Sequence, residues 1–136
     1  MSSKITVQTT ISAPIQKVWE CYTQPEHIVK WNFASPDWEC PKASVDLKVG
    51  GKFSSTMSAK DGSASFDFEG VYTKVEEYKL LEYEFGDRTA SISFEETEGQ
   101  TIVTISFDPE TENPEEMQRE GWQAILENFK KHVELN

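Results

Sequence analysis

The stretch NPEEMQREGWQAILENFKKHV, residues 113–133, is the longest amphipathic segment of the chain. Its apolar residues recur every three or four positions, which places them on one face of an α-helix. That face comprises Met117, Gly121, Trp122, Ile125, Phe129 and Val133, with Leu126 beside it. Asn113, Pro114 and Glu116 suit an N-cap, a first helical position and a capping box. We therefore predict a long terminal helix that buries one face.

A glycine interrupts this helix at an unexpected place. Gly121 lies on the apolar face, directly before Trp122, although glycine inside a helix costs roughly 1 kcal/mol relative to alanine. We interpret Gly121 as a point where the helix backbone approaches another layer closely. Trp122 can then reach sideways into the space between the two layers.

The rest of the chain is dominated by segments in which apolar and polar residues alternate, as in strands with one buried face. The predicted strands are residues 4–11, 44–49, 52–59, 64–78, 79–85, 89–99 and 100–108. Residues 12–23 and 24–32 have helical spacing, and residues 33–44 read as a loop. After Gly70 the apolar phase moves to Val71, Thr73 and Val75, which predicts a β-bulge at that glycine.

These elements predict an α+β fold. One strand is followed by two short helices, six strands and the long helix. Short connections between successive strands favour an antiparallel sheet with one buried and one solvated face. The terminal helix is the only long amphipathic element able to cover the aromatic face. We therefore expect a curved sheet wrapped around that helix.

Composition limits the possible functions. The chain has 136 residues and a formal net charge of −11, which fits a single domain over residues 1–136. The acidity disfavours nucleic acid and anionic membranes as partners, because both need clustered Lys and Arg. The chain has no apolar run long enough to span a bilayer and no apolar stretch near its start, so we expect a cytoplasmic protein.

Residues suited to metal binding or catalysis are few. Cys21 and Cys40 are expected to be thiols, although a disulfide between them stays open, and neither belongs to a metal-binding motif. His27 is expected near the surface and His132 in the last helical turn, where it interacts with the helix dipole. No triad, nucleophile elbow or phosphate loop is present. We therefore predict no catalytic residue, no metal and no cofactor.

Five stretches together carry a resemblance to a known family. They are API..VWECYTQPEHIVKWN (13–32), VDLKVGGKF (45–53), FEGVYTKVEEYKLLEYEF (68–85), GQTIVTISF (99–107) and EGWQAILENFKKHVE (120–134). In order and spacing the chain resembles the START-like, or SRPBCC, superfamily with its helix-grip fold. Within it, the chain resembles homologues of the activator of the 90-kilodalton heat-shock protein ATPase.

The resemblance implies an apolar cavity between the sheet and the long helix. The cavity candidates are Trp19, Trp31, Phe53, Ser55, Met57, Phe68, Tyr83, Phe85, Phe94, Trp122, Ile125 and Phe129. The leading hypothesis is a binding protein for a small apolar or amphipathic ligand. The alternatives are an enzyme in the same cavity, with Tyr72, Tyr83 or Asp46 as the first residues to test, and a co-chaperone-like interaction module whose chaperone partner is implied by resemblance only. A filled aromatic core without a cavity is the structural alternative to all three.

Overall fold

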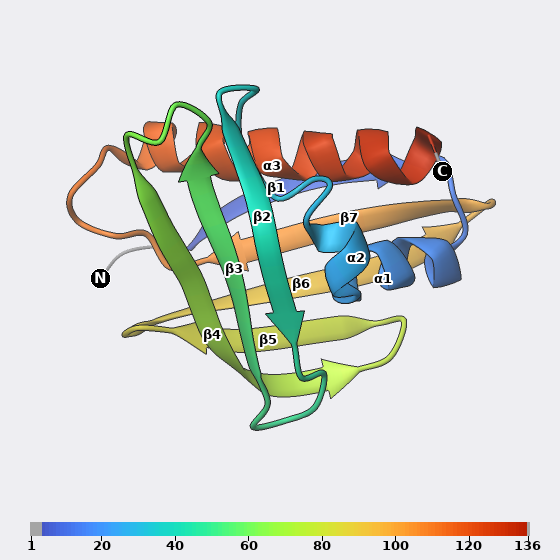
Figure 1. The fold of residues 1–136 in the computed structure, drawn as a ribbon. Coiled ribbons are helices and arrows are strands. Elements are labelled where there is room, and N and C mark those ends of the chain that lie inside the picture. The colour runs from blue at the N-terminus through green and yellow to red at the C-terminus, as the bar shows by residue number, and fades with distance from the viewer. Residues whose placement is uncertain (1–3, 136) are drawn as a thin grey trace.

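The computed structural model describes residues 4–135 of the chain, and residues 1–3 and 136 lie outside it. Its elements are β1 (Ile5–Ile11), α1 (Ile15–Thr23), α2 (Pro25–Ile28), β2 (Trp38–Val45), β3 (Lys52–Ala59), β4 (Ser65–Glu76), β5 (Leu80–Phe85), β6 (Arg88–Thr97), β7 (Gln100–Phe107) and α3 (Glu115–Leu135) (Figure 1). This order of one strand, two short helices, six strands and a long helix confirms the predicted fold class.

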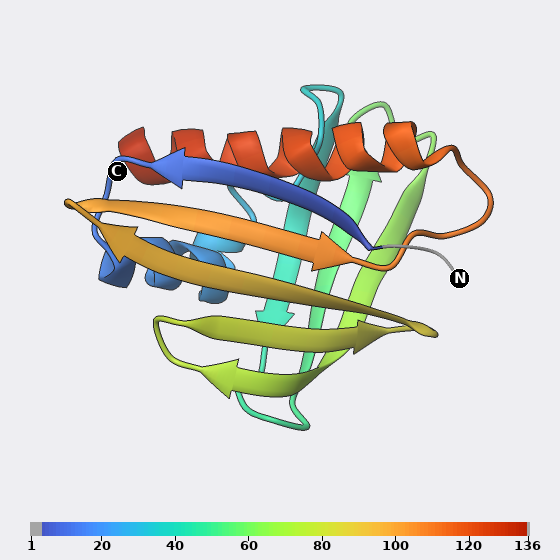
Figure 2. The ribbon, with the colours of Figure 1, turned by 180° about the vertical axis from the view of Figure 1, so that it is seen from behind.

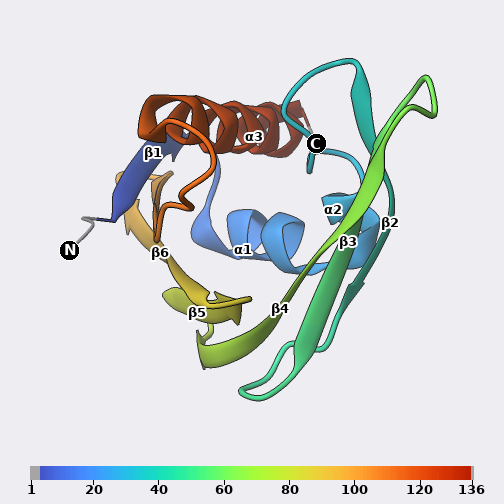
Figure 3. The same ribbon diagram turned by 90° about the vertical axis from the view of Figure 1, so that its left-hand side faces the viewer.

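All seven strands form one antiparallel sheet in the order β1-β7-β6-β5-β4-β3-β2 (Figure 2). The sheet curls strongly. It runs from β1 beneath α3, through β6 and β5, to β2 and β3 on the opposite side, and α1 lies inside the curve (Figure 3). The helix-grip arrangement expected from the sequence is therefore present.

The strands nearest α3 carry the tightest part of the core. Inward side chains of β1, β6 and β7 interlock with α1 and with the buried face of α3. The apolar members with no more than 1% of their surface exposed are Ile5, Ile11, Val18, Ile92, Val103, Phe107, Leu126, Phe129 and Val133. Two glutamates hold the turn before α1 from outside the core. Glu134 accepts a hydrogen bond from the Ser12 amide, and Glu96 accepts one from the Ile15 amide, each at 2.9 Å.

The segment predicted as a loop contains a strand. β2 occupies Trp38–Val45, whereas residues 46–51, mostly assigned to a strand from the sequence, form the turn into β3. The register between β2 and β3 shifts between Glu39 and Lys42. Pro41 lies in that irregularity, on an edge strand, where its missing N–H breaks no ladder bond. Two prolines thus obscured a strand in which Cys40 is buried.

The irregularity in β4 lies beyond Gly70. Gly70 and Tyr72 continue the buried face of Phe68, and the register with β5 shifts between Tyr72 and Lys74. Val71 and Thr73 are therefore exposed, contrary to the predicted phase change at the glycine. Gly70 serves a different purpose. A Cβ there would lie 2.6 Å from the Phe53 ring and 2.7 Å from the Glu84 carbonyl oxygen.

The helices also depart from the prediction in detail. α2 ends at Ile28, and Trp31 follows in a turn, where its indole N–H donates to the Cys21 carbonyl at 2.9 Å. α3 begins at Glu115, and Met117 is exposed. Apart from the neighbouring residues and backbone of α3 itself, no atom lies within 4 Å of a Cβ built on Gly121, so the close-approach interpretation of this glycine is wrong. Within residues 4–135, no helix combines the length and apolar character needed to cross a membrane.

Candidate functional site

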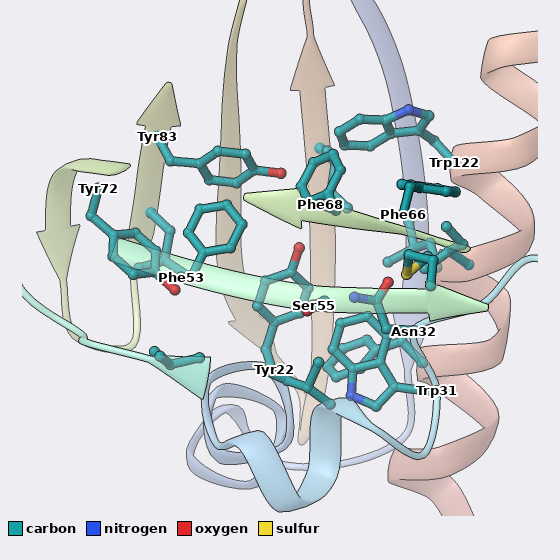
Figure 4. A pocket seen from close by; sticks show the side chains of 18 residues that line it. Tyr22, Trp31, Asn32, Phe53, Ser55, Phe66, Phe68, Tyr72, Tyr83 and Trp122 are labelled. Carbon is teal, nitrogen blue, oxygen red and sulfur yellow. The ribbon is translucent and has the colours of Figure 1, made fainter. Parts of the chain in front are cut away.

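A pocket of about 240 Å³ lies between the sheet and α3. Residues from β3, β4 and β5 form one wall, α3 forms another, and α1 with the turn after α2 closes one end (Figure 4). The lining residues are Tyr22, Ile28, Trp31, Asn32, Val45, Phe53, Ser55, Met57, Phe66, Phe68, Tyr72, Leu81, Tyr83, Ile105, Trp122, Ile125, Leu126 and Phe129.

Most residues predicted to line a cavity meet in this pocket. They are Trp31, Phe53, Ser55, Met57, Phe68, Tyr83, Trp122, Ile125 and Phe129. Trp122 reaches it in the predicted way, although Gly121 is not the reason. Its indole stacks on Phe107 with 3.8 Å between ring centroids and packs edge-on against Phe68. The stacking on a buried ring fixes the orientation of the indole at the pocket wall.

Trp19, Phe85 and Phe94, which were predicted to line the cavity, lie outside the pocket. Trp19 and Phe94 pack edge-to-face at 5.2 Å, and Tyr22 lies against Phe94 and lines the pocket. Phe85 packs against Trp122, and the Arg88 guanidinium lies 4.4 Å from its ring centroid. The side chains of Trp19, Phe85 and Phe94 are therefore buried in filled core. Sequence alternation identified the inward face correctly, but it could not show which inward residues reach a void.

Several lining residues were absent from the predicted set. Tyr22 lies one helical turn after Trp19, on the apolar face of α1, and that spacing could have identified it. Phe66 and Tyr72 share the inward face of β4. The predicted phase change at Gly70 kept Tyr72 out of the set of lining residues, although Tyr72 was considered as a catalytic candidate. Asn32 lies in a turn without periodicity, so no sequence signal places its amide at the pocket.

The polar groups of the pocket are mostly tyrosine hydroxyls. Within residues 4–135, the hydroxyls of Tyr22, Tyr72 and Tyr83 make no hydrogen bond. No fully buried polar side-chain atom of the described residues lacks a partner, so these hydroxyls remain accessible through the pocket. Figure 4 shows the Tyr83 hydroxyl and the Asn32 amide directed into the space.

Burial keeps these phenols neutral. Desolvation raises the pKa of Tyr72 to about 12 and also raises the pKa of Tyr22 and of Tyr83 above the usual range. A neutral phenol both donates and accepts a hydrogen bond. All lining residues of the described chain are uncharged. Asp46, considered a possible catalytic residue from the sequence, is exposed and lies 3.7 Å from the Lys48 ammonium group, outside the pocket.

A second group of side chains meets beside the pocket. The ligand atoms of Cys21, His27 and His132 lie within 4.8 Å of one another, and His27 Nδ1 is 2.9 Å from His132 Nε2. These residues belong to α1, α2 and α3, respectively. No local sequence pattern predicts this group, because 105 positions separate the two histidines. Both histidines are half-buried, and His132 lies in the last turn of α3 as expected.

Comparisons with known proteins agree with this architecture. Residues 12–134 match the sequence model of a family described as Activator of Hsp90 ATPase homolog 1-like protein. An AHSA1-like protein from Aeromonas hydrophila, solved by NMR, is 42% identical with a TM-score of 0.92, and the match covers 97% of this chain and 92% of that chain. No curated protein sequence matches the chain.

Two further solved structures extend the comparison. A Cytophaga hutchinsonii protein is 52% identical with a TM-score of 0.84, over 99% of this chain and 94% of that chain. A Nitrosomonas europaea protein shares the fold at 24% identity, with a TM-score of 0.86 over 98% and 95% of the two chains. With the family match spanning nearly all of its elements, the chain belongs to the Activator of Hsp90 ATPase homolog 1-like family.

Proposed function

We propose that this protein binds a small, uncharged, amphipathic molecule in the pocket between the sheet and α3. The observation that carries the proposal is the set of tyrosine hydroxyls that reach the pocket without a protein partner. A polar group in an apolar environment is costly unless it is hydrogen-bonded. A ligand with an oxygen or nitrogen atom at that position would satisfy these groups.

Size and charge narrow the class of ligand. The pocket volume of about 240 Å³ is close to the lower end of small-molecule sites, roughly 300–1,000 Å³. A ring system fits this scale, since an apolar cavity of roughly 150 Å³ can hold benzene. The uncharged lining disfavours a carboxylate or ammonium group, because neither would find a counter-charge. We therefore propose an aromatic or alicyclic ligand with one or two neutral polar groups.

Naphthalene, naphthol and naphthalenesulfonate form a suitable set of probes. They share one apolar body and differ in a neutral or a charged substituent. Trp31 and Trp122 line the pocket, so quenching of tryptophan fluorescence reports binding. We expect naphthol to bind more tightly than naphthalene and the sulfonate to bind weakest. Absence of saturable binding by both neutral probes would contradict the proposal.

Single-atom variants separate the polar contacts from the apolar body. Tyr83→Phe and Tyr22→Phe remove only a hydroxyl that reaches the pocket. They should reduce the preference for naphthol over naphthalene by about threefold to tenfold, the value of one neutral hydrogen bond. Tyr78→Phe is the matched control, since Tyr78 is exposed and packs against Trp19 outside the pocket. An equal loss in the control would show that the effect is not local.

A further inference from the structure

We propose that Cys21, His27 and His132 form a binding site for a Zn²⁺ ion. The site is independent of the ligand pocket and joins the three helices of the fold. Thiolate sulfur and imidazole nitrogen are the protein ligands that Zn²⁺ prefers. Three protein ligands leave a fourth tetrahedral position for water, the arrangement of an open zinc site.

The distances among the three side chains suit one metal ion. Ligand atoms around tetrahedral Zn²⁺ are about 3.3–3.6 Å apart, given bonds of about 2.0–2.1 Å to nitrogen and 2.3 Å to sulfur. His27 Nδ1 and His132 Nε2 are 2.9 Å apart, and all three ligand atoms lie within 4.8 Å. The separations therefore differ from those of a tetrahedral site by no more than about 1.2 Å.

The surroundings orient one of the ligands. His27 Nε2, the nitrogen that would not bind the metal, lies 3.9 Å from the Glu20 carboxylate. A carboxylate on the distal nitrogen of a metal-binding histidine fixes the ring and strengthens the ligand. Cys21 is held by its own backbone, whose carbonyl accepts the Trp31 indole N–H at 2.9 Å. The Glu20 carboxylate therefore lies at ion-pair distance from one ligand, and a hydrogen bond holds the backbone of a second.

Solvent access permits an ion to enter, and the nearby charges are of both signs. Cys21 is buried, whereas a quarter of the His27 side chain is exposed, so solvent reaches the group from the histidine side. Lys17 and Lys30 contribute positive potential at His132, and Glu20 opposes it at His27. On binding, the Cys21 thiol releases its proton to solvent, and the thiolate neutralises one of the two metal charges.

Zinc titration of the full-length, reduced protein against a chromophoric chelator tests the site. We expect one equivalent to bind and to raise the melting temperature by several degrees. Cobalt then reports the ligands, because thiolate coordination to Co²⁺ produces a charge-transfer band and tetrahedral geometry intensifies the visible bands. Wild-type protein without stoichiometric Zn²⁺ binding, or with a Co²⁺ spectrum lacking the charge-transfer band, would overturn the proposal.

Variants assign the binding to these residues. Cys21→Ser should abolish the charge-transfer band and weaken Zn²⁺ binding at least 100-fold, since loss of an outer hydrogen bond to a ligand already costs about 10–100-fold. Cys40→Ser is the matched control, because Cys40 is also a buried free cysteine but lies outside the group. Equal losses in both cysteine variants would overturn the assignment.

Variants of the two histidines test the site even if Cys21→Ser fails to fold. His27→Gln and His132→Gln alter half-buried positions and should fold, as circular dichroism would verify. Each should weaken Zn²⁺ binding to a similar extent as Cys21→Ser. Folded histidine variants that keep wild-type affinity would overturn the three-residue site. These measurements use no pocket ligand, so their outcome is separate from that of the naphthol titrations.

Discussion

Two parts of the same curved sheet differ in how they are covered. β1, β6 and β7 form a closed half, where inward residues such as Ile5, Val103 and Phe107 are no more than 1% exposed. β2, β3 and β4 form a hollow half, whose inward side chains include Phe53 and Phe68, both partly exposed at the pocket. Inward and outward residues alternate in both halves, apart from the register shifts in β2 and β4.

The difference comes from the position of the helix. α3 lies directly against β1, whereas the hollow half stands across the pocket from it (Figure 3). Bulky aromatic side chains fill part of the gap in the hollow half, and they leave a volume of about 240 Å³. Burial of an apolar face therefore does not imply close packing. The two halves should consequently respond differently to mutation.

The largest effect is expected in the closed half. Phe107→Ala removes a fully buried ring that stacks on Trp122 at 3.8 Å between centroids. Such a truncation should lower the free energy of unfolding by about 3–5 kcal/mol, because it removes buried apolar surface and leaves a cavity. Urea denaturation followed by circular dichroism measures this loss. A loss below about 1 kcal/mol would show that the closed half is as loosely packed as the hollow half.

Alkaline titration tests whether the hollow half excludes water. Burial raises the pKa of Tyr72 to about 12, compared with roughly 10 in an unfolded chain. The neutral phenol therefore contributes stability that is complete below pH ~10 and is lost as the pH rises through ~12. The full contribution is about 2–3 kcal/mol by linkage.

Denaturation midpoints at a series of pH values from neutral to alkaline provide the measurement. In Tyr72→Phe, the decline in stability should be shallower than in the wild type, because one titrating group is gone. Tyr78→Phe serves as the control, since Tyr78 is exposed. Identical slopes for the wild type and Tyr72→Phe would mean that water reaches this phenol freely.

The sequence predicted the architecture better than the interior. Leu81, Tyr83 and Phe85 face inward as their alternation indicated, and the terminal helix buries Leu126 and Phe129 as its spacing indicated. Periodicity records which side of an element is apolar, and the fold depends mainly on that. The pocket depends on the distance between layers, which no local pattern encodes.

Backbone irregularities and long-range contacts account for the remaining errors. Pro41 hid β2 because a proline normally argues against a strand, and an edge-strand bulge accommodates it here. The shift in β4 occurs after Tyr72 because the ladder with β5 decides it, and Gly70 only makes room for Phe53. The meeting of Cys21 with two histidines depends on the packing of three helices, so short-range spacing could not reveal it.

Substitution of Gly121 should change stability moderately and in the opposite direction, as a gain. The space around its position is open, because no atom lies within 4 Å of an added Cβ. Gly121→Ala should therefore stabilise the protein by about 0.5–1 kcal/mol through helix propensity alone. Thermal and urea denaturation would both detect the gain. A destabilised Gly121→Ala would restore the interpretation in which α3 needs a close approach at this point.

Phe66→Ala should have the smallest effect on stability, yet it should weaken ligand binding in the pocket. Phe66 is 52% exposed although it lines the pocket, so its removal should change the free energy of unfolding by less than about 0.5 kcal/mol. A ligand would cover part of the exposed ring. Naphthol affinity should therefore fall about fivefold, which corresponds to ~1 kcal/mol of lost apolar burial.

The paired readouts of Phe66→Ala and Phe107→Ala make the comparison decisive. In the closed half, loss of the Phe107 ring should appear mainly as a lower free energy of unfolding. In the hollow half, loss of the Phe66 ring should appear mainly as weaker naphthol binding, because half of this ring is already in solvent in the free protein. A Phe66→Ala variant that loses several kcal/mol of stability without a change in naphthol affinity would place this ring in ordinary core. The wall of the pocket would then lie elsewhere.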